Sequence, residues 1–310
     1  MKRRTGALPW AVLVATTVLL GLAGPEARAA HPGANGRIAW SSGRTDELDI
    51  WSMTTAGKGR KRLTKALRVE EGAEYSPDGT MIAFYRRTGP GDIYGAAGDI
   101  FVMDADGSGL RRLTSGPADD EDPSWSPGGD EIVFSRVTKG NPGDLWVVNA
   151  SGGGVHRLVH LPGRDIMPSW SSTDVIAFTS FRTGNGDLYS IEPDGTVLTR
   201  ITKKPTPDLA TDWDPDGSRL VFFTDSSKLS ERELWWIRGD GTHLTRLTDN
   251  DVHDAYPAWA PDGRRIAFQR DVVTNGLDFF DIWTMKPNGT GLKRLTKDGF
   301  LDGEPTWQPV

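Results

Sequence analysis

The sequence contains no cysteine, and it has only five histidines in 310 residues. Without cysteine the chain has neither a disulfide framework nor a thiol that could carry a lipid anchor, and thiolate metal sites are excluded. The histidines do not form a His-Glu-x-x-His motif. Stability must therefore come from packing and from closure of the chain, because covalent cross-links are missing.

Motifs of common enzyme classes are absent as well. There is no Gly-x-Ser-x-Gly nucleophile elbow and no glycine-rich phosphate loop of the Walker or dinucleotide-binding type. No segment has the periodicity of an amphipathic helix that would compete with a strand prediction. These absences favour a binding protein over an enzyme.

The N-terminus has the organisation of a signal peptide. Lys2-Arg3-Arg4 is followed by an apolar stretch from about Leu8 to Leu22, and Ala27-Arg28-Ala29 offers a cleavage site before Ala30. The alternative is a retained membrane anchor, but the apolar run is short and is interrupted. We therefore predict a signal peptide over 1–29, a mature domain over 30–310, a secreted or periplasmic location, and no membrane insertion after cleavage.

The charge of the mature chain bears on its partners. Residues 1–29 contain four basic residues and one acidic residue, so their removal would change the formal net charge from −6 to −9. An acidic protein is repelled by nucleic-acid phosphates, which argues against DNA or RNA as a partner. The basic run at 58–62 is interpreted as the exposed edge of a strand.

Three sequence marks recur along the chain with the same spacing of 43 to 50 residues. The first mark is an aromatic residue: Tyr75, Trp125, Trp170, Trp213, Trp259 and Trp307. The second is an acid followed by an apolar residue, at Asp49, Asp99, Asp144, Asp187, Glu233 and Asp281. The third is Arg-Leu or Arg-Ile, at Arg62, Arg112, Arg157, Arg200, Arg246 and Arg294. The chain is therefore an array of one repeated unit.

Each unit contains four short runs rich in β-branched and aromatic residues, which predict four strands. Turn dipeptides such as Asp78-Gly79 and Asp106-Gly107 separate the runs and supply the backbone that tight hairpins need. Four strands in a period near 45 residues are typical of a β-propeller, whose blades pack around a central channel. Apolar runs such as 82–84 do not alternate, because neighbouring blades cover both faces of each sheet.

The two ends of the chain predict the number of blades. After Trp307 only three residues remain, so the last unit has a first strand and lacks the other three. Segments 37–40, 49–51 and 62–64 near the N-terminus match the missing second, third and fourth strands. We predict an all-β, six-bladed β-propeller whose sixth blade is closed by one C-terminal and three N-terminal strands, which removes an open sheet edge.

The repeats resemble those of the TolB-like β-propellers, a WD-like propeller repeat family. The resemblance is carried by motifs such as Ser-Pro-Asp-Gly at 76–79 and Asp-Ile-Phe-Val-Met-Asp-Ala-Asp-Gly at 99–107, and it covers the whole mature chain. It implies the propeller fold. We expect no counterpart of the N-terminal α/β domain of TolB, because the chain has no residues left to build one. It implies less about function, because similar blades occur in scaffolds, in propeller domains of some peptidases and in certain polysaccharide lyases.

An acid stands five residues before the aromatic mark in every unit. These acids are Glu70, Asp120, Asp165, Asp208, Asp254 and Asp302. Since the first strand of a blade is the innermost, we expect them to ring the channel mouth on the face that carries the inter-blade loops, here called the upper face. Either they anchor loops through hydrogen bonds, or their convergence forms a site for a hard cation, calcium or magnesium rather than zinc.

Departures from the repeat point to a binding surface. The connection between the second and third strands spans nine residues from Trp40 to Asp49, but 15 from Phe84 to Asp99 and 13 from Phe268 to Asp281. The two long connections belong to the blades that flank blade six. They carry apolar and aromatic residues at Ile93, Tyr94, Leu277, Phe279 and Phe280, which either pack within extended hairpins or form a contact patch.

The sequence therefore predicts a monomeric, extracytoplasmic binding module with no organic cofactor. Its expected partner is a protein or a glycan that contacts the upper face in the cell envelope or outside the cell. The alternative is a metal-dependent enzyme, such as a glycan lyase or a lactonase, working at the channel mouth.

Overall fold

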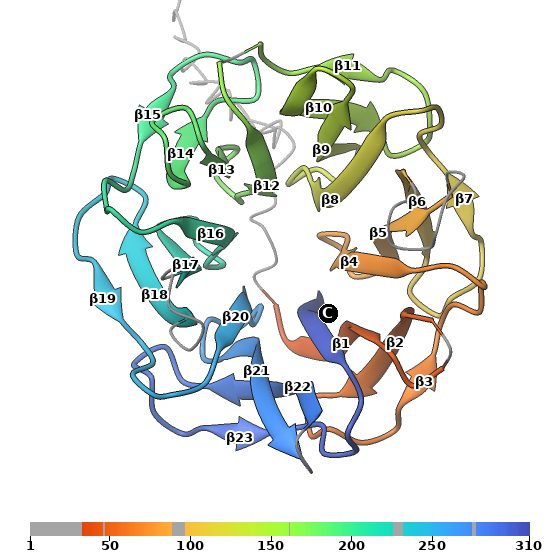
Figure 1. Ribbon diagram of the computed structural model, residues 1–310. Helices are drawn as coiled ribbons and strands as arrows, with labels where there is room; N and C mark the ends of the chain where they lie inside the picture. The colour runs from red at the N-terminus through yellow and green to blue at the C-terminus, as the bar shows by residue number, and fades with distance from the viewer. Residues whose placement is uncertain (1–32, 46, 89–96, 161, 226–231, 275–276) are drawn as a thin grey trace, which may run out of the picture.

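A computed structural model describes residues 33–310 except 46, 89–96, 161, 226–231 and 275–276. The predicted signal peptide lies outside the described residues. Six four-stranded antiparallel sheets surround a central channel, which confirms the predicted six-bladed β-propeller (Figure 1). In each sheet the first strand is the innermost, and the fourth is a two-residue strand at the periphery.

The strand bounds follow the chain from blade one to blade six. Blade one contains β4 (Glu70–Tyr75), β5 (Met81–Arg87), β6 (Gly98–Asp104) and β7 (Arg111–Arg112). Blade two contains β8 (Asp119–Trp125), β9 (Glu131–Thr138), β10 (Asn141–Asn149) and β11 (His156–Arg157). Blade three contains β12 (Asp165–Trp170), β13 (Ile176–Ser180), β14 (Asp187–Ile191) and β15 (Thr199–Arg200). Blade four contains β16 (Asp208–Trp213), β17 (Arg219–Asp225), β18 (Arg232–Arg238) and β19 (Thr245–Arg246). Blade five contains β20 (Asp254–Trp259), β21 (Ile266–Thr274), β22 (Leu277–Met285) and β23 (Lys293–Arg294). Blade six contains β24 (Asp302–Pro309), β1 (Asn35–Ser42), β2 (Asp49–Thr54) and β3 (Lys61–Arg62).

The hydrophobic core lies between the blades. Ala39 and Ile50 of blade six pack with Tyr75, Phe84 and Met103 of blade one in a single buried cluster. Equivalent clusters join the other neighbouring blades. Because each central strand is covered on both faces, its side chains are apolar without alternation.

Blade six is closed by strands from both ends of the chain. β24 pairs antiparallel with β1, with Ile38 opposite Trp307 and Ser42 opposite Asp302. The backbones of Ala34 and Val310 exchange two hydrogen bonds, of 3.0 and 3.1 Å. The closure predicted from the sequence is therefore confirmed.

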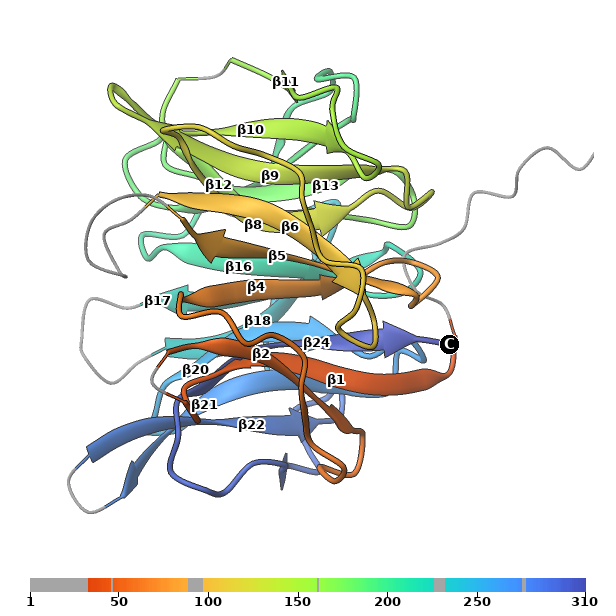
Figure 2. The ribbon, with the colours of Figure 1, turned by 90° about the vertical axis from the view of Figure 1, so that its right-hand side faces the viewer.

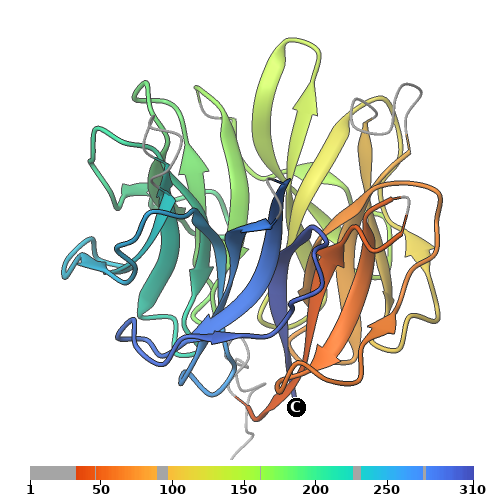
Figure 3. The ribbon, with the colours of Figure 1, turned by 60° about the horizontal axis from the view of Figure 1, so that its bottom comes forward.

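The two faces of the ring differ. The connections between second and third strands and the inter-blade loops share the upper face, whereas the C-terminus lies on the opposite, lower face (Figures 2 and 3). The β9–β10 and β21–β22 hairpins project from the upper face (Figure 2). In the second hairpin the pairing continues to Thr274 opposite Leu277, so the long connection predicted in blade five is an extension of the sheet.

Deletion of residues 303–310 should abolish cooperative folding or cause aggregation. The deletion removes almost all of β24. The strand β1 then loses its hydrogen-bonded neighbour, and the hydrophobic cluster that contains Trp307 loses this side chain. Thermal unfolding and size-exclusion chromatography of the truncated protein test this. A soluble monomer with the melting transition of the full chain would contradict the closure.

Candidate functional site

All six inner strands contain the same bulge where they face the channel. The third residue of each strand segment, counted from the repeated acid, has a positive φ. These residues are Gly72, Asp122, Met167, Ala210, Tyr256 and Glu304, with φ between 48° and 63°. A Cβ atom at Gly72 would lie 2.9 Å from the Tyr85 ring, so this position has no room for a side chain. The other five hold a side chain in a backbone conformation that costs free energy, which marks the channel wall as a constrained region.

The six acids predicted to ring the channel mouth occupy equivalent positions at the upper ends of the inner strands, and all are buried. Each has a basic partner nearby in the same unit of the repeat. The ion pairs are Glu70–Arg86, Asp120–Arg136, Asp165–Arg182, Asp208–Lys204, Asp254–Arg270 and Asp302–Arg44, with N–O distances from 2.5 to 3.5 Å. Whether a cation also binds these carboxylates stays a prediction.

Each basic partner also lies over an aromatic ring of the third strand. The stacked rings belong to Trp51, Phe101, Trp146, Tyr189, Trp235 and Trp283, with the cation 3.8 to 5.6 Å from the ring centroid. Such contacts stabilise a cation inside a protein and compensate the burial of the carboxylate. The acid, the cation and the ring form one repeated unit that joins the inner strand to its blade.

The second set of repeated acids has a similar arrangement. Asp49, Asp99, Asp144, Asp187, Glu233 and Asp281 each pair with the arginine of the fourth strand in their own blade. In five blades the threonine that follows this strand accepts a 2.9 Å hydrogen bond from the third-strand backbone, as Thr64 does from Ile50. These acids connect the two outer strands.

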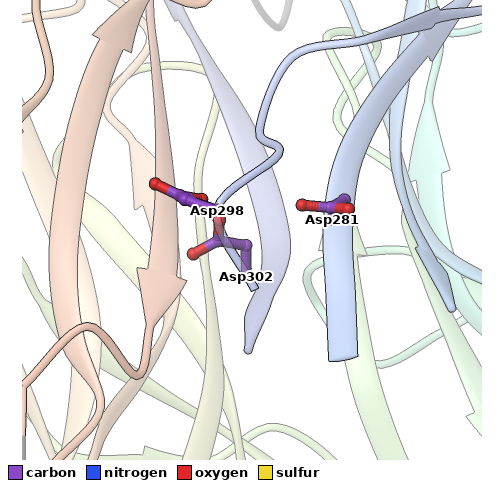
Figure 4. A group of neighbouring side chains, drawn as sticks. All are labelled: Asp281, Asp298 and Asp302. Carbon is purple, nitrogen blue, oxygen red and sulfur yellow. The ribbon is translucent and has the colours of Figure 1, made fainter. Parts of the chain in front are cut away.

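One group of three carboxylates in the described part of the chain has ligand oxygens within 4.8 Å of one another: Asp281, Asp298 and Asp302 (Figure 4). Arg44 donates hydrogen bonds to both Asp298 and Asp302, and Arg294 pairs with Asp281. The guanidinium groups therefore already balance these charges. The cluster connects β24 with blade five and with the segment that follows β1.

A cavity of about 150 Å³ lies in the central channel. Its wall contains four half-buried carboxylates, Glu74, Asp122, Asp212 and Glu304. No lysine, arginine or histidine is among the described residues that line it. The other lining residues are prolines, small residues, Met167, Tyr256, Trp259 and Trp307. We call this the channel cavity.

Burial raises the pKa of the mouth acids Glu70, Asp165 and Asp208, where a nearby cation opposes the effect, and it also acts on the channel carboxylates. Burial, reinforced by the charge of Glu121, raises the pKa of Asp122 to about 7. Burial also raises the pKa of Asp212 to about 7, although the Trp259 amide donates a 2.6 Å hydrogen bond to its carboxylate. Burial likewise raises the pKa of Glu74 and that of Glu304 well above the usual range.

The channel carboxylates were not predicted from the sequence. They stand two and four residues after the repeated acid, where other blades have glycine, methionine, alanine, tyrosine, serine or threonine. The signal was therefore present as a departure from the repeat. The bulge was the missing information, because it changes which residues of the inner strand face the channel.

The predicted contact patch is only partly within the described residues. Ile93 and Tyr94 lie outside them, and the side chain of Leu277 is likewise not described. Phe279 and Phe280 are half-buried, and Phe280 forms a parallel β-bridge with Leu301. Leu301 and its neighbour Phe300 are exposed, at 39% and 36%.

This arrangement brings the blade-five hairpin against the loop that leads into β24. We call Phe279, Phe280, Phe300 and Leu301 the upper apolar patch. The next inter-blade loop, which leads from blade six to blade one, carries Leu67, which is 82% exposed. Apart from Val310 at the C-terminus, the other exposed large hydrophobic residues in the described part of the chain, such as Leu110 and Leu244, lie in the turns between third and fourth strands at the opposite end of the blades.

Comparison with known proteins agrees with this architecture. The family model described as TolB beta propeller domain matches residues 158–310. TolB from Acinetobacter baumannii is similar in structure, with a TM-score of 0.74 and 18% identity over 89% of this chain and 67% of that chain. A putative TolB from Agrobacterium tumefaciens has a TM-score of 0.65 and 18% identity, covering 89% of this chain and 99% of that one.

Similarity extends beyond bacterial TolB proteins. A chain of a nidogen/laminin complex has a TM-score of 0.66 and 10% identity, covering 88% of this chain and 98% of that one. Identities this low show the fold alone. No curated protein matches the sequence. The fold defines the class, a six-bladed β-propeller. Together with the family match, it makes this chain a TolB-like β-propeller.

Replacing Asp122 and Asp212 by asparagine should flatten the pH dependence of stability. Their raised pKa values mean that the folded protein retains protons that the unfolded chain releases between about pH 4 and pH 7. This contribution to stability is fully present below about pH 4 and is lost as the pH rises through about 7. The variant should melt a few degrees higher than wild type at pH 8, since about 1 kcal/mol moves the melting temperature of a domain this large by roughly 2 °C.

Thermal unfolding of the wild type and of the D122N/D212N variant from pH 4.5 to pH 8 measures this effect. The exposed residues Asp249 and Asp251, replaced by asparagine, provide a control with the same change in charge. Parallel curves for the wild type and the channel variant would show that the two channel carboxylates do not carry this pH dependence.

Chelation should leave the melting temperature unchanged within about 1 °C. A bound cation would add stability of order RT ln(1 + [L]/Kd), but each ring carboxylate already has an arginine or lysine partner. Thermal unfolding with and without EDTA is the measurement. A drop in melting temperature that calcium reverses would instead make Glu70, Asp120, Asp165, Asp208, Asp254 and Asp302 metal ligands.

Proposed function

We propose that this TolB-like propeller is an extracytoplasmic binding module that docks a protein partner on its upper face. The observation that carries the proposal is the upper apolar patch. Phe300 and Leu301 are exposed where the Phe280–Leu301 bridge joins two segments, and Leu67 is exposed on the neighbouring loop. Exposed apolar side chains beside one blade of the upper face favour a contact surface there.

The two loops are connected through blade six. Gly43 donates a 2.9 Å hydrogen bond to the carbonyl of Leu301, and the side chain of Leu48 also approaches the Gly43 position. The Glu70 amide, which follows the Leu67 loop, donates to the carbonyl of Leu48 at 2.9 Å. The apolar side chains therefore flank the upper end of one blade and do not form an even ring.

Three exposed basic residues border this surface, together with Asp298, which is paired with Arg44 and Arg60. Lys65 and Arg68 flank Leu67, and Lys297 precedes Phe300; all three are exposed. Aromatic and aliphatic anchors within a charged rim suit a protein segment of opposite charge. We therefore favour an acidic, partly apolar protein segment as the ligand, with a glycan as the outcome that the binding test would otherwise reveal.

The location is part of the proposal. The TolB likeness and the signal-peptide pattern at 1–29 support an extracytoplasmic site, and no helix in the described part of the chain is long and apolar enough to cross a membrane. A propeller of this fold in a nidogen/laminin complex supports protein binding by such a scaffold. A metal-dependent enzyme at the channel mouth has less support, because the ring carboxylates are paired with basic side chains.

Replacing Leu67 and Leu301 by serine should weaken partner capture about tenfold or more while shifting the melting temperature by no more than about 2 °C. Both side chains are exposed, at 82% and 39%, so they contribute little to the core. Capture from envelope and culture-medium extracts, followed by affinity measurement with the isolated partner, tests the effect. F279A/F280A provides a second variant on the hairpin side.

The matched control is L110S/L244S, which removes two exposed leucines from turns at the other end of the blades. This control should bind as well as wild type. If it loses affinity equally, or if the L67S/L301S variant binds normally, the partner does not dock on the upper apolar patch.

A further inference from the structure

The lower face of blade five carries a group of basic side chains. The β20–β21 turn contributes Arg264 and Arg265. The β22–β23 turn begins with Lys286, and Lys293 follows at the start of β23. All are exposed except Arg265, which is half-buried. None of the four has an ion pair within the described part of the chain, so their charges are available to a ligand.

A matched position in blade four shows how the fold can satisfy such a cation internally. Arg219 stands five residues after Asp214, and its Nε donates a 2.6 Å hydrogen bond to this buried carboxylate. Arg265 occupies the same place in blade five, but Ala260 replaces the acid. The repeat therefore supplies a partner for this arginine in blade four and omits the partner in blade five.

Two hollows lie beside these side chains. The first is lined by residues 262–265 and 286–288, and the second by Asn35, Thr55, Ala56, Arg265, Thr284, Lys293 and Trp307. Because Arg265 lines both, the hollows adjoin each other and extend from blade five to blade six. We call this surface the lower groove. Its described lining contains one acid, Asp262, whose carboxylate accepts a 2.9 Å hydrogen bond from the Arg264 amide.

The β2–β3 turn of blade six borders the lower groove. A Cβ atom at Gly57 would lie 2.9 Å from the carbonyl oxygen of Leu295, so this turn packs closely against the chain that follows β23. The turn carries Lys58, which is exposed and has no ion pair among the residues that the structure describes. Positive side chains therefore continue from one blade to the next.

The sign of the charge changes around the lower face. The corresponding turns of blades one, three and four present exposed aspartates: Asp78, Asp106, Asp194, Asp216 and Asp240. A flat anionic bilayer that contacts the basic turns would also meet these aspartates, which would repel it. A narrow chain can follow the lower groove without approaching them. The charge distribution therefore favours a linear polyanion over a membrane surface.

The uncharged lining residues distinguish a polysaccharide from an acidic peptide. Asn35 and Asn288 supply amide groups, which can hydrogen-bond to sugar hydroxyls. Peptides are usually held by aromatic or large side chains that enter an apolar pocket. The apolar lining residues of the lower groove are Ala56, Pro287 and the buried Trp307, which offer such a side chain little surface. A hydroxyl-rich ligand fits this lining better.

We propose that the lower groove binds an anionic polysaccharide, a linear chain that carries carboxylate or sulfate groups. These groups pair with the basic side chains of blade five, and Lys58 extends the contact to blade six. The amides of the groove hydrogen-bond to the sugar hydroxyls. This site lies on the opposite face from the upper apolar patch and does not depend on the docking of a protein there.

Calorimetry with heparin and polygalacturonate oligosaccharides tests the proposal. At least one of the two should bind saturably, with an affinity that falls as sodium chloride is added, because salt screens the charge pairs. Neutral dextran should not bind. Absence of binding by both acidic oligosaccharides at low ionic strength would overturn the proposal.

Loss of two groove lysines should weaken this binding. K286S/K293S should lower the affinity about fivefold or more, and it should shift the melting temperature by no more than about 2 °C because both lysines are exposed. The matched control is K139S/K203S, which removes two exposed lysines outside the groove and should bind like wild type. Equal loss of affinity in the two variants would show that net charge, and not the lower groove, governs binding.

A second variant uses the comparison with blade four. A260D offers Arg265 the acid that Asp214 offers to Arg219, so it should weaken binding several-fold without removing a basic side chain. Asp214 is itself buried in blade four, so the repeat accommodates an acid at this place. If A260D does not fold, K286S/K293S decides the question. Normal binding by K286S/K293S would exclude the lower groove as the site.

Other polyanions give distinguishable outcomes. Tighter binding of poly-glutamate than of either oligosaccharide would assign the groove to an acidic protein segment. Preferential binding to vesicles of phosphatidylcholine and phosphatidylglycerol in equal amounts would assign it to a membrane surface. Either result overturns the polysaccharide. The L67S/L301S variant should bind the oligosaccharides like wild type, which separates this site from the upper apolar patch.

Discussion

The pairing of β24 with β1 is the constraint on which the other features depend. A ring of blades is stable only when its last blade is complete, and here that blade takes one strand from the C-terminus and three from the N-terminus. Polar contacts reinforce the join: Trp40 Nε1 donates a 3.0 Å hydrogen bond to Asp302, and Arg44 pairs with the same carboxylate. Closure fixes the radius of the channel, and so the separation of the side chains that face it.

The mouth carboxylates and the channel carboxylates differ in how their charge is balanced. The repeated acids are neutralised by a cation that stacks on an aromatic ring, an arrangement that recurs in all six blades and serves the fold. Among the described residues, the four acids of the channel cavity have no basic partner, and they lie in blades one, two, four and six. Burial raises the pKa values of these four acids, so protonation removes part of the charge that burial would otherwise penalise.

The repeat predicted the fold because every blade packs against its neighbours in the same way. The aromatic, acidic and arginine marks predicted four strands per blade, and the three residues after Trp307 predicted the closure. The basic partners of the mouth acids were missed, although Arg86, Arg136 and Arg270 each stand two residues after a buried phenylalanine. Nor did the sequence reveal the bulge, since positive φ at Met167 or Tyr256 is not a local preference of those residues and is imposed by the ring.

The position of the chain ends has a practical and topological consequence. Val310 is hydrogen-bonded to Ala34, and the C-terminus lies on the lower face, so both ends of the ordered ring leave from the same side. Anything attached to either end, whether a linker, a solid support or a neighbouring protein, lies on the side of the lower face. The hairpins and the aromatic surface of blades five and six then point away from the attachment and remain accessible from solution.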